Sequence, residues 1–352
     1  MNPNFGRFFQ NQQMPAQRAI INFSKINTIN ETSFINSSLQ ALGSTKYMFM
    51  WVSQWTNNVY QLNMNPRYAL TKEIVNLFYA LNQSRIPDSS NFILRYLNEV
   101  RNYTNLTVNN PIEFFYYLFQ IIHKENNYPM NPNQNMNSLK NLTLAQKVND
   151  NFMRNFFLSL LSQTHNSIIS QNFFTILKKE VRCNFCSIKY SYEYKYMIKF
   201  KINEYLNYRN ACKPERANYT LTLDECFECY TGGYPCKCDT CTYSMNAQVF
   251  TSIYSLPNVL IIALIRNSHK YFGDLDFRNN LSLNGFCVQG MFKKNNYYLK
   301  ACVSLNNKGE SFTDIQTSNN IWFRYYGNQV SRLNNVNYDL KAFEPQLLIY
   351  ES

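Results

Sequence analysis

Two features of this chain have residue types and spacing suited to catalysis or metal binding. They are a serine at a predicted helix start and cysteines in C-x-x-C pairs. Ser33 lies where an irregular polar stretch ends, and Asn36 or Ser37 can cap the apolar helical run that follows. The unpaired amides and the positive dipole at a helix N-terminus stabilise an anion. These features make Ser33 a candidate nucleophile.

The cysteine pairs Cys183-x-x-Cys186 and Cys238-x-x-Cys241 each fall in a predicted turn between strands. Two neighbouring hairpins that present such pairs bring together four thiolates, the donor set that structural zinc prefers. The spacing therefore predicts one structural Zn2+ held by Cys183, Cys186, Cys238 and Cys241. Cys236 is an alternative ligand to Cys238, and the alternative for the whole cluster is a set of reduced thiols without metal.

A competing pair, Cys226 and Cys229, has the same spacing. It follows Thr222–Asp224, a segment that can cap a helix, so we expect both thiols to lie on a helix. Burial is the more common fate of a free cysteine. We therefore predict that this pair packs into the core and does not bind the metal.

Apolar residues recur at helical spacing through the first half of the chain. This period, and a proline that can open a first helical turn, predict four helices at Leu70–Leu81, Asn91–Arg101, Pro111–His123 and Phe152–Leu161. Residues 126–150 are rich in Asn, Pro and Met, and this composition predicts a loop insertion.

From about Phe173 the pattern changes to alternation, which predicts strands. Aromatic and aliphatic residues alternate with Glu and Lys from Tyr192 to Ile202, the pattern of one long half-buried strand. Further strands are predicted at Ala247–Tyr254, Val259–Ile265, Tyr297–Val303, Ile321–Tyr325 and Gln346–Tyr350.

Residues 32–40 read TSFINSSLQ and resemble the cysteine box of the ubiquitin-specific proteases, a papain-like family of deubiquitinases with the pattern G-L-x-N-x-G-N-T-C-Y-M-N-S-x-L-Q. Ser33 stands where this family has its catalytic cysteine. Thr28 stands where the family has the asparagine that stabilises the oxyanion. Three further segments are similar to boxes of the family: residues 111–122, 256–267 and 345–350.

The resemblance also places the other two catalytic positions. The family's G-H-Y-x-A-Y box falls on Gly309–Asp314, so Glu310 stands in place of the general base histidine. Tyr326 stands in place of the residue that orients this histidine. The resemblance therefore implies a catalytically degenerate member, altered at Thr28, Ser33, Glu310 and Tyr326. We expect the three histidines of the chain to be ordinary surface or capping residues: His123, His165 and His269.

Over residues 24–352 the resemblance implies an α+β fold of the ubiquitin-specific protease type, with a helical thumb, a β-sheet palm and zinc-bearing β fingers. The implied boundaries are about 24–165 for the thumb, 171–255 for the fingers and 256–352 for the palm, which also takes part of the finger strands. The Asn- and Gln-rich residues 1–18 predict a disordered tail before a single domain at 19–352.

The composition excludes a wholly disordered chain, because 45% of the 352 residues are hydrophobic and 16% are aromatic. The formal net charge of +12 would attract an acidic protein surface or a nucleic acid. The Lys and Arg residues are spread along the chain without a block of five. This distribution favours a protein partner over direct nucleic-acid binding.

The N-terminal residues lack the apolar core of a signal peptide, and the longest strongly apolar run, Val259–Ile265, is too short to cross a bilayer. We therefore expect no membrane partner and an intracellular location, either cytoplasmic or nuclear. In such a location the ten cysteines are expected to be thiols or zinc ligands.

Three functions are consistent with these features. The first is a non-catalytic scaffold or binding module in a larger complex. For this function the resemblance offers inactive relatives in spliceosomal and mRNA-decay assemblies, and the positive charge would suit a ribonucleoprotein. The second is a reader that binds ubiquitin or a ubiquitin-like protein without hydrolysis. The third is a divergent active deubiquitinase, and the altered residues favour the three functions in this order.

Overall fold

The computed structural model of this protein describes residues 33–83, 85, 87–105, 107–130, 141–186, 188–216, 219–238, 241, 247–266, 275–288, 296–317, 320–327, 329–334 and 339–352. The predicted tail at residues 1–18 lies outside these ranges, as do Thr28 and His269. In the described part of the chain, no helix is both long enough and apolar enough to cross a membrane.

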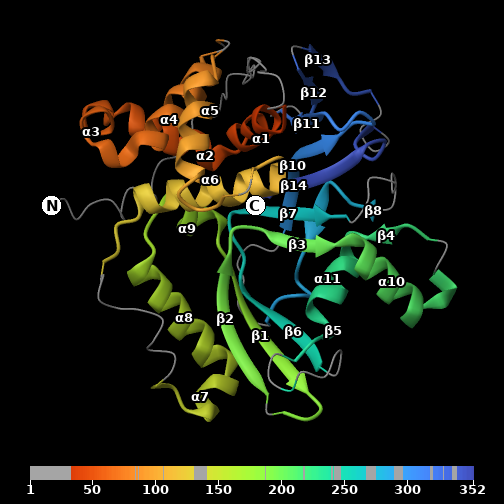
Figure 1. Cartoon of the computed structure of the whole chain (residues 1–352). Coiled ribbons are helices and arrows are strands. Elements are labelled where there is room, and N and C mark those ends of the chain that lie inside the picture. The colour runs from red at the N-terminus through yellow and green to blue at the C-terminus, as the bar shows by residue number, and fades with distance from the viewer. Residues whose placement is uncertain are drawn as a thin grey trace.

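The N-terminal part of the described chain forms a helical lobe around α6 (Pro111–Asn126), near the centre of Figure 1. Phe114 and Phe115 of α6 are fully buried, and α6 packs against α1, α4, α5 and α9. Pro111 occupies the first turn of α6, where a missing amide costs little. The other helices of the lobe are α1 (Ser33–Gly43), α2 (Lys46–Thr56), α3 (Val59–Met64), the 3-10 turn η2 (Pro66–Tyr68), α4 (Ala69–Asn82) and α5 (Ser90–Val100).

The helices predicted at 70–81, 91–101 and 111–123 are confirmed as α4, α5 and α6. Between α6 and the first strand, the described residues form α7 (Leu144–Val148), α8 (Asp150–Thr164) and α9 (Ile168–Phe173). α8 confirms the helix predicted at 152–161. The loop predicted at 126–150 is wrong in part, because α7 lies within it and is started by a capping box between Thr143 and Gln146.

A four-stranded sheet extends away from the helical lobe, with α8 along one side (Figure 1). Its order is β2-β1-β6-β5, and every described pairing in it is antiparallel. Met153 and Phe157 of α8 are buried against Ile176 and Tyr254 of this sheet. Its strands are β1 (Thr175–Cys183), β2 (Lys189–Lys195), β5 (Tyr234–Cys236) and β6 (Ala247–Ser255).

An eight-stranded sheet of the described residues has the order β13-β12-β11-β10-β14-β7-β3, with β9 paired to β10. One face of β7 (Val259–Ile265) belongs to the core of the helical lobe, while Leu260 and Ile262 on its other face belong to a second core. Burial on both faces explains its unbroken apolar run. The other strands are β3 (Ile198–Lys201), β9 (Asn280–Ser282), β10 (Asn296–Leu305), β11 (Ser311–Gln316), β12 (Trp322–Tyr326), β13 (Gln329–Arg332) and β14 (Glu344–Glu351).

The second core lies under α10 (Ile202–Cys212) and α11 (Leu223–Thr231). Thr222 caps α11, and this helix confirms the one predicted to carry Cys226 and Cys229. Cys226 is fully buried and Cys229 is half-buried. Near these helices are the 3-10 turn η4 (Pro214–Arg216) and the short parallel pair of β4 (Leu221–Thr222) and β8 (Leu275–Asp276).

The single long strand predicted at 192–202 is wrong. β2 ends at Lys195, the chain bends at residues 196–197, and β3 continues in the eight-stranded sheet, parallel to β7. α10 then begins at Ile202. Tyr194 and Tyr196 before the bend pack against the core of the helical lobe, and Ile198 and Phe200 after it lie in the second core. Inward residues thus alternate on both sides of the bend, so the pattern does not reveal the change of sheet. The strands predicted at 247–254, 259–265, 297–303, 321–325 and 346–350 are confirmed as β6, β7, β10, β12 and β14.

Two histidines join the helical lobe to the four-stranded sheet. The rings of His123 on α6 and His165 at the end of α8 stack with their centroids 5.2 Å apart. His123 Nδ1 lies 2.6 Å from Ser167 Oγ, and His165 Nε2 lies 3.1 Å from the Tyr194 hydroxyl on β2. Burial, with the neighbouring ring, lowers the pKa of His123 to about 4, and burial lowers the pKa of His165.

Acid should therefore destabilise the protein through this pair. Because the pKa of His123 falls from 6.5 to about 4 on folding, the unfolded chain binds the proton first, and stability is lost as pH drops from 6.5 towards 4. The shift corresponds to about 3 kcal/mol once the pH is well below the folded-state pKa. Urea denaturation at neutral pH and near pH 4.5 should show the loss for the wild type and a smaller one for His123→Gln. An equal loss of stability in the wild type and in His123→Gln would show that protonation of His123 is not the cause.

Candidate functional site

Ser33 is the first residue of α1, which packs against β10 and β11. The backbone N–H of Ser311, at the start of β11, donates a hydrogen bond to Ser33 Oγ over 3.2 Å. The Ser311 hydroxyl lies 2.6 Å from that of Ser37, and the Ser37 hydroxyl also donates to the carbonyl oxygen of Phe34. The fold thus brings the predicted nucleophile position against the segment that carries Glu310.

Glu310 and Tyr326 also meet, as the resemblance implies. The Tyr326 hydroxyl donates a hydrogen bond to Glu310 Oε2. Asn306 Nδ2 donates to the same carboxylate oxygen over 2.8 Å and to the Tyr326 hydroxyl over 3.2 Å, while Asn306 Oδ1 accepts the Glu310 amide. The hydrogen bond from Tyr326 lowers the pKa of the exposed Glu310 carboxyl, which makes it a weaker proton acceptor.

Asn306 is a member of this cluster that sequence reasoning missed. It lies one residue beyond β10, in the turn that leads to β11, and its side chain binds both the backbone amide and the carboxylate of Glu310. An asparagine four residues before Glu310 in a turn is a common local pattern, so the sequence held no signal that set it apart.

The described histidines lie elsewhere. His123 is buried and contacts Ser167, so the expectation that it is a surface or capping residue is wrong. His165 is the C-cap of α8, as expected. Their hydrogen-bond partners lie at the junction of α6, α8 and β2, away from the Ser33 cluster. His269 and Thr28 lie outside the described residues.

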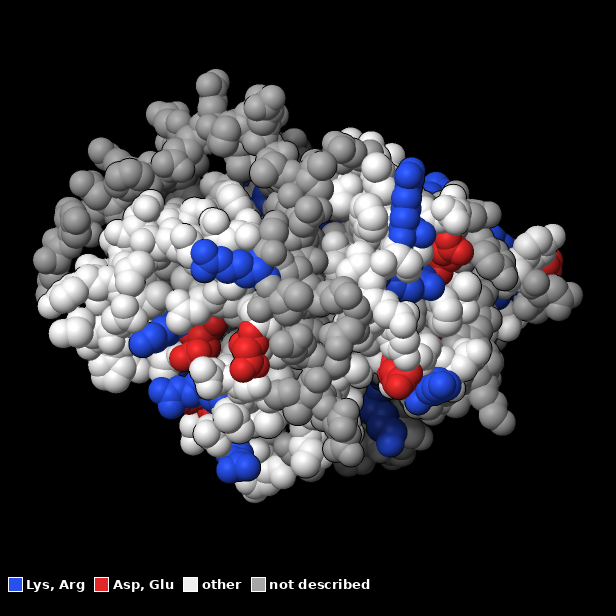
Figure 2. Space-filling view, turned by 90° about the horizontal axis from the view of Figure 1, so that it is seen from above, with Lys and Arg blue, Asp and Glu red and all other residues white. Residues whose placement is uncertain are grey.

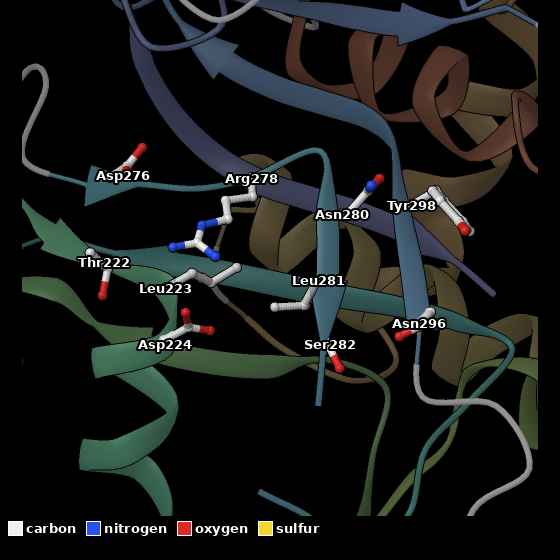
Figure 3. Close-up of a pocket in the computed structure, with 10 residues that line it drawn as sticks. All are labelled: Thr222, Leu223, Asp224, Asp276, Arg278, Asn280, Leu281, Ser282, Asn296 and Tyr298. Carbon is white, nitrogen blue, oxygen red and sulfur yellow. The ribbon is translucent and has the colours of Figure 1, made fainter. Parts of the chain in front are cut away.

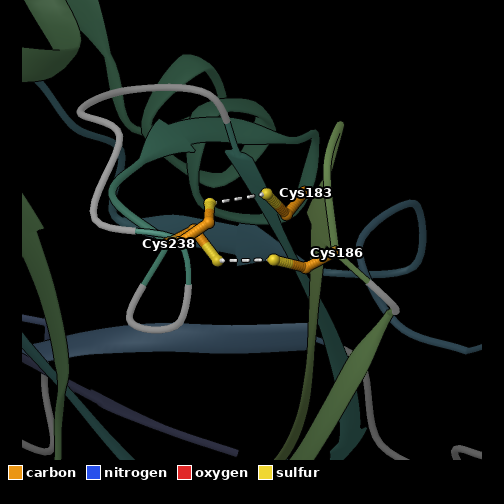
Figure 4. Close-up of side chains that lie close together, drawn as sticks. Cys183, Cys186 and Cys238 are labelled. Carbon is orange, nitrogen blue, oxygen red and sulfur yellow. Dashed lines mark hydrogen bonds between the residues drawn. The ribbon is translucent and has the colours of Figure 1, made fainter.

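The four predicted cysteine ligands lie together at the far end of the four-stranded sheet. All four Sγ atoms are within 4.8 Å of one another. Cys183 Sγ lies 3.4 Å from Cys241 Sγ, and Cys186 Sγ lies 3.9 Å from Cys238 Sγ (Figure 4). Sulfurs around a tetrahedral zinc with bonds of about 2.3 Å are roughly 3.8 Å apart. The cluster therefore fits a tetrahedral metal ion without rearrangement of its elements.

Strand register explains how two distant cysteine pairs meet. In the β1/β6 ladder Cys183 pairs with Ala247, and in the β5/β6 ladder Cys236 pairs with the same residue. The turns that follow β1 and β5 therefore leave the sheet side by side, and each carries one C-x-x-C pair. Cys236 itself is in the ladder and is not one of the four clustered sulfurs.

Comparison with known proteins decides the family. A family model described as ubiquitin carboxyl-terminal hydrolase matches residues 24–350. The chain belongs to the ubiquitin carboxyl-terminal hydrolase family. No curated protein matches it.

Solved structures agree with this assignment. A chain of the yeast SAGA DUB module with an Sgf73 mutant matches with a TM-score of 0.64 and 17% identity, over 97% of this chain and 70% of that chain. The SAGA Ubp8/Sgf11/Sus1/Sgf73 DUB module bound to ubiquitin aldehyde matches with a TM-score of 0.64 and 16% identity, over 97% of this chain and 71% of that chain. The SAGA DUB module bound to monoubiquitin matches with a TM-score of 0.62 and 17% identity, over 98% of this chain and 72% of that chain. At these identities the likeness concerns the fold.

The predicted ubiquitin-specific protease fold is confirmed by the family match and by these structures. The helical lobe corresponds to the expected thumb, the eight-stranded sheet to the palm, and the four-stranded sheet with its cysteine cluster to the fingers. The residue boundaries implied for these parts, and for the domain at 19–352, stay predictions.

A pocket of about 320 Å³ is lined by Asn296 and Tyr298 at the start of β10 (Figure 3). The Ser33 cluster lies at the other end of this strand, where β10 leads through Asn306 to Glu310. β10 has ten residues, so the two ends are roughly 30 Å apart. Asp224, Asp276 and Arg278 supply the charged groups of the pocket, and Lys341 forms an ion pair with Asp276. The pocket is therefore separate from Ser33 and Glu310.

Proposed function

We propose that this chain is a catalytically inactive member of its family that serves as a binding module in a multi-protein assembly. The observation that carries the proposal is the hydrogen bonding around Ser33. Its hydroxyl accepts the Ser311 amide, and no imidazole or carboxylate in the described ranges hydrogen-bonds to it. A serine hydroxyl needs an adjacent base to become a nucleophile at neutral pH.

Glu310 is a poor substitute for that base. Its carboxylate is already bonded to Tyr326 and Asn306, and the bond from Tyr326 lowers its pKa. The same group would have to protonate the leaving amine near pH 7, which a carboxyl with a lowered pKa does badly. At the remaining position, Thr28 has no side-chain amide with which to stabilise an oxyanion.

We propose proteins as the partners. The matched SAGA modules contain several protein chains, and two of these structures are described with ubiquitin aldehyde or monoubiquitin bound. On the face shown in Figure 2, the Lys and Arg side chains of the described residues are separated by uncharged residues and by Asp and Glu. Dispersed charge suits protein surfaces better than a nucleic-acid groove. The ribonucleoprotein setting stays a prediction that these features do not support.

We also propose that the metal of the four-cysteine cluster is Zn2+. Thiolate ligands in a tetrahedron select zinc over magnesium and calcium, which take oxygen ligands. Bound zinc would hold the two finger hairpins together. All ten cysteines lie in the described ranges and none of them forms a disulfide there, which fits the reducing, intracellular location that we propose.

The test of inactivity is hydrolysis of ubiquitin that carries a fluorophore on its C-terminal carbonyl. Wild-type protein and Ser33→Ala should both release fluorophore at the rate of buffer alone, because Ser33 lacks a base. A wild-type rate above buffer that falls to the buffer rate in Ser33→Ala would contradict the proposal.

Titration of isotope-labelled ubiquitin with the protein separates the scaffold from the reader. A scaffold that does not use ubiquitin leaves the ubiquitin resonances unchanged. Saturable shifts without hydrolysis would favour the reader, which shares the inactive site.

A further inference from the structure

Four tyrosine rings form a continuous row at the surface between the helical lobe and the sheets. The ring centroids of Tyr103 and Tyr117 are 6.5 Å apart, those of Tyr117 and Tyr116 are 5.3 Å apart, and those of Tyr116 and Tyr196 are 6.0 Å apart. Tyr116 and Tyr117 lie on α6, Tyr103 lies in the segment before it, and Tyr196 lies in the bend between β2 and β3. The row thus bridges three separate segments.

One lysine lies over an end ring of the row and a second lysine lies over an inner ring. Lys124 Nζ lies 5.7 Å from the centroid of Tyr103, and Lys199 Nζ lies 5.3 Å from the centroid of Tyr116. Both lysines are exposed, and Tyr103 and Tyr116 are 36% and 37% exposed, while Tyr117 and Tyr196 are half-buried against the core. A partner can therefore reach the lysines and the two exposed rings. The four tyrosines and these two lysines are called the tyrosine row below.

The polar groups of the row lack acceptors of their own. Within the described part of the chain, none of the four hydroxyls has a hydrogen bond, and neither ammonium has a hydrogen bond or an ion pair. Glu113, one turn earlier on α6, attracts Lys199 only at longer range, and Lys195 repels it. The complementary ligand must therefore bring acceptor oxygens, and carboxylates accept from ammonium and hydroxyl groups most strongly.

The dimensions of the row suit an extended peptide. Tyr117 and Lys124 are seven residues apart on α6, which is roughly 10 Å along the helix axis. An extended peptide covers that distance in about three residues.

We propose that the tyrosine row is the docking surface for an extended acidic segment of a partner protein. The proposal rests on the proposed binding function and names the chemistry of its partner. Single-stranded RNA is less suited, because neighbouring rings of the row meet at 50°, 77° and 72°. Successive bases stack on open ring faces, and these angles turn adjacent faces away from one another.

Fluorescence anisotropy with a labelled deca-glutamate peptide tests the proposal on the full chain. The double variant Lys124→Glu/Lys199→Glu should weaken binding about tenfold or more, because it replaces both ammonium groups with repelling carboxylates. The matched control is Arg95→Glu/Lys189→Glu, which reverses two exposed cations outside the row. Each double variant lowers the formal net charge by four, from +12 to +8. The control should therefore keep the wild-type affinity within about twofold.

A second variant, Tyr103→Phe/Tyr117→Phe, keeps the rings and removes two hydroxyls. It should weaken peptide binding several-fold while its thermal unfolding stays that of the wild type. Equal weakening by the row variant and the charge control would overturn the proposal, since binding would then follow net charge alone. Tighter binding of a labelled ten-nucleotide poly-U RNA, lost in the row variant, would overturn it in favour of RNA. These binding experiments do not measure hydrolysis of ubiquitin. Failure of the docking proposal is therefore distinguishable from failure of the proposal that the site at Ser33 is inactive.

Discussion

Loss of the zinc that we propose for the four-cysteine cluster should unfold the far end of the finger sheet while the thumb stays folded. Binding free energy of structural zinc in small modules is of the order of 10 kcal/mol, and short hairpins cannot replace it. Cys183→Ser should therefore lower zinc content from one equivalent to near zero. Hydrogen exchange of the described amides in β1, β2 and β6 should then accelerate, while α6 keeps its protection.

Cys212→Ser is the matched control, because Cys212 is an exposed free thiol that is not one of the clustered sulfurs. It should retain the metal and the wild-type exchange pattern. Purified wild-type protein with less than half an equivalent of zinc, and unchanged exchange in Cys183→Ser, would show that the cluster is a set of reduced thiols.

The second large effect is expected at a buried ion pair of the palm. Arg324 on β12 donates two hydrogen bonds of 2.8 Å to the fully buried carboxylate of Asp314 on β11. The guanidinium lies 4.5 Å from the ring centroid of Phe312 and 4.7 Å from that of Phe343. Burial raises the pKa of Asp314 to about 6 in spite of Arg324. Among the described residues, Arg324 is the cation that forms an ion pair with this carboxylate and compensates its charge.

Arg324→Leu should lower the free energy of unfolding by about 3–5 kcal/mol at pH 7, because it leaves a buried carboxylate without its partner. Urea denaturation measures the loss. The loss should shrink near pH 5, where the raised pKa of Asp314 lets the carboxyl take up a proton and become neutral.

Arg332→Leu serves as the control, because Arg332 is an exposed arginine on the neighbouring strand β13. It should cost no more than about 0.5 kcal/mol, as most exposed substitutions do. Similar losses for the two variants would contradict a special role of the pair.

The cysteine cluster was predictable because its signal is local. Two C-x-x-C pairs define their own turns, and the only further requirement is that their hairpins be neighbours, which the β1/β6 ladder fulfils. The contact of Glu310 with Tyr326 was predictable only through the resemblance, since no property of either residue indicates the other.

Helix α2 was not predicted, although its sequence carries a helical signal. Thr45 caps the helix, and its buried residues Met48, Trp51, Val52 and Trp55 follow the helical spacing i, i+3, i+4 and i+7. The tyrosine row, in contrast, has no sequence signal. Tyr103, Tyr117 and Tyr196 come from three segments, and their contact depends on how α6 packs beside the bend after β2.

Ser33→Cys in the fluorogenic ubiquitin assay tests the account most directly. The thiol is a better nucleophile than the hydroxyl, but it still needs an imidazole to lower its pKa and to protonate the leaving group. The Glu310 carboxylate nearby would raise the pKa of that thiol by like-charge repulsion. The account predicts that Ser33→Cys releases fluorophore no faster than the wild type does. Robust cleavage by this single variant would show that a base reaches position 33, and it would make the chain a silenced enzyme and not a binding module.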